Sequence, residues 1–378
     1  MGIVVASGCG GVLLGSISLP AGRFAVGCGH VILNLYEFLC RIWESIPGSI
    51  LITGRPAGWQ IGLYYGILAA AAGIWKHGNR RFHIFLLVIA PVFLMRVPLL
   101  GMEISFLDVG QGDGICIRTE RGAILVDGGS TDQKQLGKNR LEPFLKSQGV
   151  SEVDYAIVSH GDQDHISGLM YLMEESDITI KNLVLPGRGK GQEVYDRLSR
   201  AALAQGGTIH WMERGDRLKW GRLEIFCLYP AAELSPGAGV CKKEEDRNEH
   251  SLVLRVSYGN FGMLLTGDMS GEGERRLLEL ERADGQGAKM EKNGIGQAQV
   301  LKVAHHGSAY STTREWLDEV SPAWAVISYG EGNRYGHPGP EVLRLLEERN
   351  VQTFHTGKSG AVRLWTNGER IWWSQWIL

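Results

Sequence analysis

The stretch SHGDQDHISGL, residues 159–169, places two histidines and two aspartates within six consecutive positions. It follows the apolar run VDYAIV, whose branched and aromatic residues predict a buried strand, and ISGLMYLMEE after it predicts a helix. The polar loop lies where a rigid strand releases the chain, which is a usual position for catalytic groups. The stretch therefore predicts a functional loop between a strand and a helix.

The four polar side chains of this loop can reach two neighbouring positions. In an extended segment His160 and Asp162 point the same way. Asp164 and His165 stand beside the coming helix and can point back to an adjacent position. One loop can therefore supply ligands to two adjacent metal ions.

Two further strand ends carry residues of the metal-ligand type. FGMLLTGD places Asp268 after an apolar run, and VLKVAHHGS does the same for His305 and His306. An isolated aspartate before a helix is usually an N-cap, and an isolated histidine at a strand end usually has no special role. Together with the loop at 160–165, however, these residues predict a metal site in which an aspartate bridges two cations.

Charge is divided unevenly between the two parts of the chain. Residues 1–100 hold seven basic and two acidic residues, a net charge of +5, while all 378 residues have a net charge of −2. The remaining part therefore carries −7, which is poor for holding a polyanion by surface charge alone. Six cysteines without a CxxC pair argue against a zinc ribbon or a disulfide framework.

The first hundred residues are sparsely charged and predict a membrane-associated helical segment. GWQIGLYYGILAAAAGIW (58–75) has no charge over eighteen residues and has tryptophans near both ends, as a transmembrane helix does. FHIFLLVIAPVFLMRVPLL (82–100) is the second candidate, which Pro91 would kink. Apolar residues on all faces favour a membrane hairpin over a pair of buried core helices.

Two other N-terminal segments are apolar but less typical of a membrane span. Residues 1–19 are rich in glycine and lack the basic start of a signal peptide, and residues 24–46 predict an amphipathic helix at the interface. The basic turn KHGNRR (76–81) should stay in the cytoplasm. We therefore expect the domain at 101–378 on the extracytoplasmic face of the cell membrane.

Residues 101–378 alternate short apolar strands with helices, which predicts an α/β layered domain. The expected strands are 102–109, 114–119, 122–127, 154–159, 182–185, 208–211, 222–228, 251–257, 261–266, 299–304, 323–328, 351–355 and 361–366. The expected helices are 137–148, 167–175, 191–204, 271–281, 312–319 and 339–348. Residues 232–250 and 282–297 are rich in glycine and charge and predict surface loops.

HGDQDH resembles the HxHxDH signature of the metallo-β-lactamase fold, with Asp162 in the place of the second histidine. Six more motifs follow the order found in the ComEC-type DNA-internalisation competence proteins. They are FLDVGQGDG (106–114), ILVDGG (124–129), NEHSLVL (248–254), LLTGD (264–268), LKVAHHGS (301–308) and RYGHPGPEVL (334–343). The membrane hairpin before them also resembles the end of that family's permease region.

This resemblance implies a metallo-β-lactamase αβ/βα sandwich preceded by an α-helical membrane hairpin, with two divalent ions as cofactors. One ion would take Asp164, His165, Asp268 and His305; the other would take His160 and Asp162, share Asp268, and receive a weak contact from Asn248. His306 stays open as an alternative to His305. Carboxylate in place of imidazole hardens the second site, so we expect Mn²⁺ or Zn²⁺, with the second ion held more weakly.

Other residues are assigned roles around the ions. We predict Asp164, Asp268 and His337 as the catalytic residues, with His337 and Ser308 able to contact phosphate or protonate the leaving oxygen. Asp108 and Asp113 are candidates for orienting ligands from behind, or equally for a turn between two strands. Two motifs depart from the family: Asn248 stands where metallo-β-lactamases have a histidine, with His250 nearby, and Gly339 replaces a second histidine.

The resemblance implies a phosphodiesterase or nuclease acting on single-stranded DNA during uptake, in which a hydroxide formed between two metal ions attacks phosphorus. Family members are much longer, so the expected partners include a missing permease portion and other DNA-uptake proteins. The net charge of −7 keeps open a membrane-tethered hydrolase of a small phosphate ester. A non-catalytic structural part of an uptake complex is the third alternative, suggested by Asn248.

Overall fold

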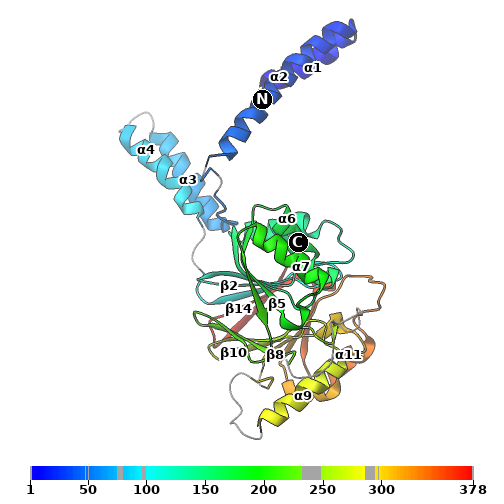
Figure 1. Cartoon of the computed structure of the whole chain (residues 1–378). Helices are drawn as coiled ribbons and strands as arrows, with labels where there is room; N and C mark the ends of the chain where they lie inside the picture. Colours follow the sequence, from blue (N-terminus) through cyan, green and yellow to red (C-terminus); the bar gives the residue numbers. More distant parts are fainter. Residues whose placement is uncertain are drawn as a thin grey trace. The chain divides into compact units, whose positions relative to one another are not determined.

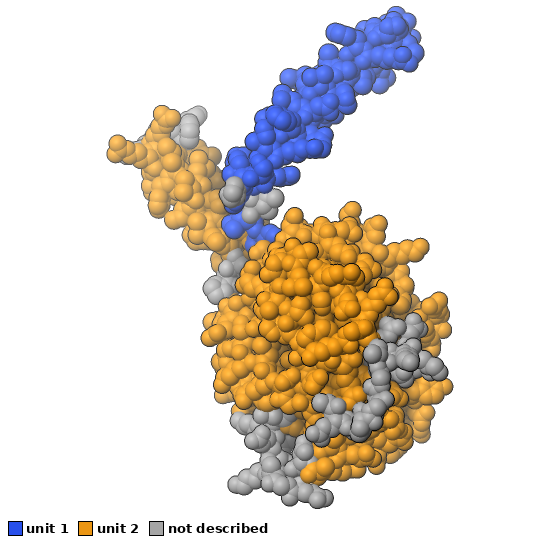
Figure 2. Space-filling model, viewed as in Figure 1, with its two compact units in different colours: residues 1–52 blue, residues 53–378 orange. Residues whose placement is uncertain are grey.

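The computed structural model describes residues 2–46, 48–49, 51–74, 80–95, 99–231, 248–285, 294–296 and 298–376. The chain divides into two compact units, residues 1–52 and residues 53–378 (Figure 2). The boundary between a membrane segment and a hydrolase domain at residue 100 stays a prediction.

The first unit is a pair of packed helices, α1 (Gly2–Gly15) and α2 (Leu19–Glu44). Their close approach depends on glycine, because a Cβ at Gly22 would lie 2.6 Å from the Cα of Gly15 and 2.9 Å from the carbonyl oxygen of Gly11. In the part of the chain that the structure describes, α2 is the one helix long and apolar enough to cross a membrane. Sequence patterning had predicted an interfacial helix for most of this range.

The predicted hairpin corresponds to α3 (Gly58–Ile74), α4 (Arg80–Ile89) and a 3-10 turn, η1 (Ala90–Leu94). The α-helix ends just before Pro91, because proline has no N–H to donate. The buried Gln60 side chain joins the two arms by donating to the carbonyl oxygens of Phe93 (2.9 Å) and Met95 (2.8 Å). Residue 75 of the first predicted span, residues 76–79 of the basic turn and residues 96–98 of the second predicted span lie outside the described residues. Which helices cross a bilayer stays a prediction.

Two mixed sheets make up most of the second unit. Among the described residues, the first sheet has eight strands in the order β15-β14-β1-β2-β3-β4-β5-β6 and the second has seven in the order β13-β12-β11-β10-β9-β8-β7. The first sheet consists of β1 (Met102–Phe106), β2 (Ile115–Thr119), β3 (Gly122–Val126), β4 (Glu152–Ile157), β5 (Thr179–Pro186), β6 (Thr208–Met212), β14 (Ala361–Thr366) and β15 (Ile371–Trp376). The second consists of β7 (Arg217–Trp220), β8 (Leu223–Tyr229), β9 (Val253–Tyr258), β10 (Phe261–Leu265), β11 (Val300–Lys302), β12 (Trp324–Ile327) and β13 (Gln352–His355).

Helices cover the outer face of each sheet, so the unit has four layers in the order helix, sheet, sheet, helix (Figure 1). The first sheet carries a π-helical turn, η2 (Gly137–Leu141), with α5 (Glu142–Ser147), α6 (Gln163–Glu174) and α7 (Glu193–Ala204); the second carries α9 (Gly271–Gly285), α10 (Arg314–Val320) and α11 (Pro340–Glu348). The predicted αβ/βα sandwich is confirmed.

Side chains of the two inner faces interdigitate into one core, which includes Ile104, Val126, Ile225 and Met263. Each such side chain stabilises the fold by about 1.5–3 kcal/mol relative to leaving it in water. Strands β3 to β6 pair in parallel, as do β10 to β13, which brings their carboxyl ends to common edges. Both sheets thus offer a row of loops at which polar residues can gather.

The structure adds two strands that the sequence did not predict. In β7 the exposed Arg217 and Lys219 alternate with half-buried residues, so its four positions give little apolar signal. β15 is the last strand at one edge of its sheet. Helix α6 also begins at Gln163, four residues before the predicted start, with Asp162 as its N-cap residue. Asp164 and His165 therefore stand on the first turn of the helix.

Candidate metal centre

Polar residues of both sheets gather where strands of the sandwich end. Asp127 directly follows β3, the loop at 158–162 joins β4 to α6, and Asp268 follows β10. His306 lies in η4 (Ala304–Gly307), just after β11. Carboxyl ends of neighbouring parallel strands are the usual location of ligand sites in α/β folds.

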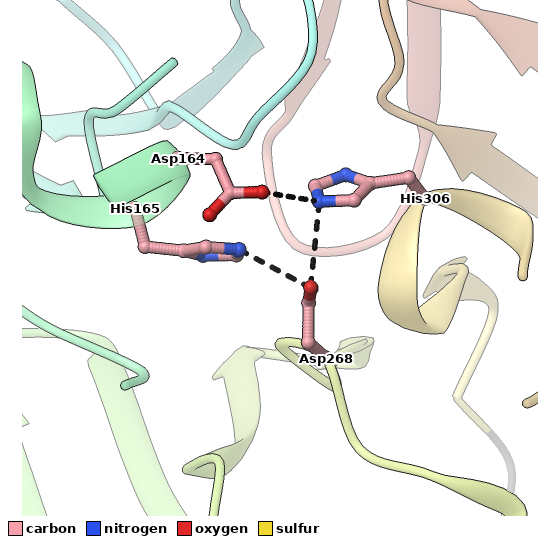
Figure 3. Close-up of side chains that lie close together, drawn as sticks. All are labelled: Asp164, His165, Asp268 and His306. Atoms are coloured by element: carbon pink, nitrogen blue, oxygen red, sulfur yellow. Dashed lines mark ion pairs between the residues drawn. The ribbon is translucent and has the colours of Figure 1, made fainter. Parts of the chain in front are cut away.

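Four side chains at these strand ends and on the first turn of α6 form a compact group: Asp164, His165, Asp268 and His306 (Figure 3). One potential ligand atom from each lies within 4.8 Å of all the others. His306 Nε2 is 3.4 Å from an Oδ2 atom of both Asp164 and Asp268, and His165 Nε2 is 3.3 Å from Asp268 Oδ1. Asp268 therefore stands between the two histidines.

The donor atoms of this group fit a divalent cation. Among the described residues, His165 Nε2, His306 Nε2 and Asp268 Oδ1 are buried and have no hydrogen-bond partner of good geometry. A buried polar atom without a partner is costly, so three such atoms within 4.8 Å of one another fit a site for a cation. Two imidazoles with two carboxylates suit Zn²⁺ or Mn²⁺.

The opposite charges of the group shift one another's pKa values. Burial lowers the pKa of His306, but Asp268 and Asp164 outweigh it and raise that pKa to about 10. Burial raises the pKa of Asp164, but His306 and His165 outweigh it and lower that pKa to about 2. The pKa of His165 is likewise raised and that of Asp268 lowered, each against the effect of burial. Without a cation, protons on the two imidazoles balance the carboxylates.

The other ring nitrogen of each histidine is held by a fixed acceptor. His165 Nδ1 lies 3.0 Å from Asp127 Oδ2, and His306 Nδ1 donates to the carbonyl oxygen of Ser328 over 3.0 Å. These contacts put the proton on Nδ1 and leave Nε2 facing the group, as in known metal-binding histidines. Asp127 Oδ1 also accepts a hydrogen bond of 2.7 Å from the backbone N–H of Ser159. Asp127 thereby ties the loop of β4 to the end of β3.

Sequence reasoning did not single out Asp127 or Lys302, although both lie in recognised motifs. Lys302 is 1% exposed and forms an ion pair with Asp113, which lies 3.9 Å from the Nδ1 atoms of both His165 and His306. Asp113, Asp127 and His165 form a second group with metal-ligand spacing. The Lys302 ammonium already supplies a cation there, so we interpret this group as support behind the first.

A strained turn decides which of the two adjacent histidines enters the group. His305, His306 and Gly307 all have left-handed backbone conformations, with φ of 49°, 55° and 80°. The turn buries His306 to 1% exposure, while the His305 side chain is 31% exposed and its Nε2 lies 3.7 Å from Asp268 Oδ2. The structure therefore brings His306 into the group, where the sequence favoured His305.

The residues predicted for a second ion are less closely gathered. His160 Nε2 is 3.7 Å from Asp162 Oδ2, and burial together with the charge on His165 lowers the pKa of His160. His160 Nε2 and Asn248 Oδ1 are buried atoms without a hydrogen-bond partner among the described residues. No ligand-type group of three that includes His160 or Asp162 occurs in the described part of the chain.

The remaining predicted residues differ in whether they lie near the group. His337 is half-buried, with its ring centroid 5.6 Å from that of His305, and burial and the charge of His306 lower its pKa to about 4. Ser308 is buried directly after the turn. Asp108 instead pairs with Arg140 at 3.3 Å and accepts from the N–H of Gly110, so it belongs to a turn.

Comparison with known proteins identifies relatives of this chain. The profile of the Metallo-beta-lactamase superfamily matches residues 107–331. ComE operon protein 3 of Bacillus subtilis is 32% identical over 275 residues, which cover 69% of this chain and 32% of that protein. Competence protein ComA of Neisseria gonorrhoeae is 29% identical over 268 residues, covering 71% and 33%. The chain spans about a third of the length of these relatives, and the predicted resemblance to competence proteins is confirmed.

Among solved structures, the metallo-beta-lactamase fold protein YhfI from Bacillus subtilis matches with a TM-score of 0.43 and 12% sequence identity. The match covers 72% of this chain and 100% of that one.

Proposed function

The chain belongs to the metallo-β-lactamase superfamily, and from this membership and its site we propose a metal-dependent phosphodiesterase that cuts single-stranded DNA during DNA uptake. The observation that carries the proposal is the buried group of Asp164, His165, Asp268 and His306 with its unpartnered donor atoms. A group of this kind can bind divalent cations. Bound cations would offset the negative charge of the DNA phosphates at the site.

Two sets of residues would hold the divalent ions. The first ion would be held by Asp164, His165, Asp268 and His306, and the second by His160 and Asp162, with Asp268 available to both. Asn248 Oδ1 is available for a weak contact to the second. The looser gathering of the second set supports a second ion that is bound more weakly, and carboxylate at 162 favours Mn²⁺ there. When bound, such ions polarise a phosphoryl oxygen and lower the pKa of a water molecule.

The residues of the chain do the positioning. Asp127 and the Ser328 carbonyl hold the rings of His165 and His306, so that both Nε2 atoms face Asp268. The low pKa of Asp164 keeps its carboxylate ionised at neutral pH. The His337 ring lies 6.2 Å from that of His306 and, with a pKa of about 4, is unprotonated at neutral pH, so we assign it and Ser308, which follows the histidine turn, contact with a phosphate oxygen.

The nature of the relatives supports DNA as the substrate over a small ester. Competence protein ComA is named for competence, and it is 29% identical to this chain over 268 residues. The net charge of −7 outside residues 1–100 favours the alternative of a small phosphate ester. Two divalent ions would offset about half of that charge.

The test is a comparison of substrates on the full chain in detergent, supplied with Mn²⁺. We expect cleavage of single-stranded DNA that disappears in the Asp268→Ala variant, and about two metal ions per chain by elemental analysis. A small bis-phosphodiester is the second substrate. If the protein hydrolyses it and leaves DNA uncut, the small-ester alternative replaces the DNA proposal. Metal bound without either activity would favour a structural part of an uptake complex, and less than one metal per chain would refute the two-metal site.

We also propose that the hydrolase unit faces the outside of the cell membrane and works with a permease portion. The positive turn at 76–81 supports this orientation. A reporter fused at the C-terminus should be active only outside the cytoplasm, and activity only inside would reverse the assignment.

A further inference from the structure

Beside the metal group, four side chains form a row that reaches the surface. The ring of His306 is stacked on that of His337 at a centroid distance of 6.2 Å and an angle of 27°. His337 is in turn stacked on Tyr335 at 5.8 Å and 25°. The guanidinium of Arg334 lies over the Tyr335 ring at 5.0 Å. Three near-parallel rings, followed by the Arg334 guanidinium, therefore lead from a predicted metal ligand to solvent.

The outer end of this row is exposed and positively charged. Tyr335 is 47% exposed, although large aromatic side chains are usually well buried. Arg334 donates to the Tyr335 hydroxyl over 2.9 Å and forms no ion pair with a carboxylate in the described part of the chain. Two other arginines of the second unit already have partners: Arg314 pairs with Glu348, and Arg188 donates to the carbonyl of Ala231. The charge of Arg334 thus remains available to a ligand.

The loop that carries the row is held in one conformation by Asn333. The side-chain oxygen of Asn333 accepts from the N–H groups of Tyr335 and His337, both at 3.1 Å. Its amide nitrogen donates to the carbonyl oxygens of Gly330 (2.9 Å) and His337 (2.6 Å). All polar capacity of this side chain is spent on its own loop, so Tyr335 is presented without a large ordering cost on binding.

We propose that Arg334 and Tyr335, backed by His337, bind a nucleobase of the strand whose phosphate lies at the metal group. Bases of single-stranded nucleic acids stack on aromatic rings and on arginine planes, while arginine also contacts the backbone. Stacking does not depend on the base sequence. It would therefore let a domain with a negative net charge hold single-stranded DNA. The inference rests on the proposed function and names the part of the substrate that a small ester lacks.

The test measures binding, so it does not depend on turnover. The full chain in detergent is loaded with Mn²⁺ and titrated with two fluorescent phosphorothioate probes, a short oligothymidylate and an equally long strand of tetrahydrofuran units without bases. We expect the base-bearing probe to bind roughly 5- to 150-fold more tightly, the range for one stacked base. Tyr335→Ala should remove this difference by weakening only the base-bearing probe, and Tyr335→Trp should retain it.

A matched control is Trp372→Ala, since Trp372 is 45% exposed and lies on β15, where it pairs with the β14 residue Trp365. It should leave both dissociation constants unchanged. The platform is refuted if the wild type shows no preference for bases or binds neither probe. It is also refuted if Tyr335→Ala weakens both probes equally, which would indicate a phosphate clamp alone. Loss of DNA cleavage with the base preference intact would refute the proposed function and not the platform.

Discussion

His165 connects the parts of the site at the scale of single residues. Its Nε2 faces Asp268 and its Nδ1 meets Asp127, which also holds the backbone of Ser159. The ring is fully buried, so neither contact is exchanged for water. A single side chain thus transmits the position of β3 to the metal group, which explains why an aspartate at a strand end matters for the chemistry.

The choice between adjacent histidines gives the first prediction. His306→Ala should lower the metal content of the protein by about one ion per chain, because it removes a buried donor that lies 3.4 Å from two carboxylates. His305→Ala is the matched control and should leave that content unchanged, since its ring is partly exposed and lies farther from Asp268. Elemental analysis with circular dichroism to check folding decides between them. Metal loss in the His305 variant alone would reverse the assignment.

The pKa values of the metal group predict how metal affinity depends on pH. His306, with a pKa of about 10, and His165, with a raised pKa, both carry a second proton at neutral pH when no metal is bound. A cation must displace these protons, so affinity should fall as pH falls, by about 10-fold per unit for each proton released. Calorimetric titration with Mn²⁺ between about pH 6 and 8 in buffers of different ionisation enthalpy measures both quantities. An affinity independent of pH would contradict the protonated state.

At the scale of elements, helix α9 supports the segment that follows the histidine turn. Glu274 on α9 is fully buried, and its two carboxylate oxygens accept from the N–H groups of Thr312 (2.6 Å) and Thr313 (2.7 Å). The N–H of Gly271 donates to the carbonyl of Tyr310 over 2.8 Å. A helix that is distant in sequence therefore fixes the chain between His306 and α10.

Substituting Glu274 should reveal this support through its pH dependence. Burial raises the pKa of Glu274 to about 7, against the effect of its hydrogen bonds to Thr313 and Thr312. The folded state therefore favours the protonated carboxyl: its contribution is complete below about pH 4.5 and is lost as pH rises through 7. We expect wild type to lose about 3 kcal/mol relative to Glu274→Gln over this range.

Thermal unfolding of both proteins at a series of pH values measures this difference. Glu279→Gln is the matched control, because Glu279 lies on the exposed face of the same helix. This substitution should leave the unfolding temperature unchanged. A difference between wild type and Glu274→Gln that does not vary with pH would show that the buried carboxyl keeps one protonation state.

At the scale of the whole molecule, the metal group joins the two sheets. Asp164 and His165 come from the helix after β4 of the first sheet, whereas Asp268 and His306 follow β10 and β11 of the second. The buried pair of Asp113 and Lys302 also joins a residue next to β2 to one in β11. A cation bound by the group would therefore hold the two sheets of the sandwich together.

Removal of metal should consequently destabilise the protein. With free metal at 100 times its dissociation constant, the bound state gains about 2.7 kcal/mol, and EDTA should abolish this gain and lower the unfolding temperature. Added Mn²⁺ should restore it. The unfolding temperature of Asp268→Asn should not respond to either treatment, because Asp268 is the ligand that we propose for both ions. A wild-type protein insensitive to EDTA would show that the sheets are held without the ion.

The sequence by itself determined the architecture and the segments that supply the candidate site. Apolar runs of strand length alternating with helices predicted the layered fold, because burial requires that pattern in almost any arrangement of the chain. The motifs HGDQDH, TGD and HHGS predicted a metal site, since ligand-type residues are rarely concentrated at strand ends for other reasons. Apolar periodicity and short motifs are local, so each can be recognised within a single segment of the sequence.

Only the tertiary structure decided which atoms meet. Whether His305 or His306 enters the group depends on a left-handed turn, and the support by Asp127 and Lys302 depends on contacts between strands far apart in the chain. The same is true of the stacked row from His306 to Arg334. Neighbouring residues in a sequence look equivalent, but backbone dihedral angles and packing send one into the core and the other to solvent.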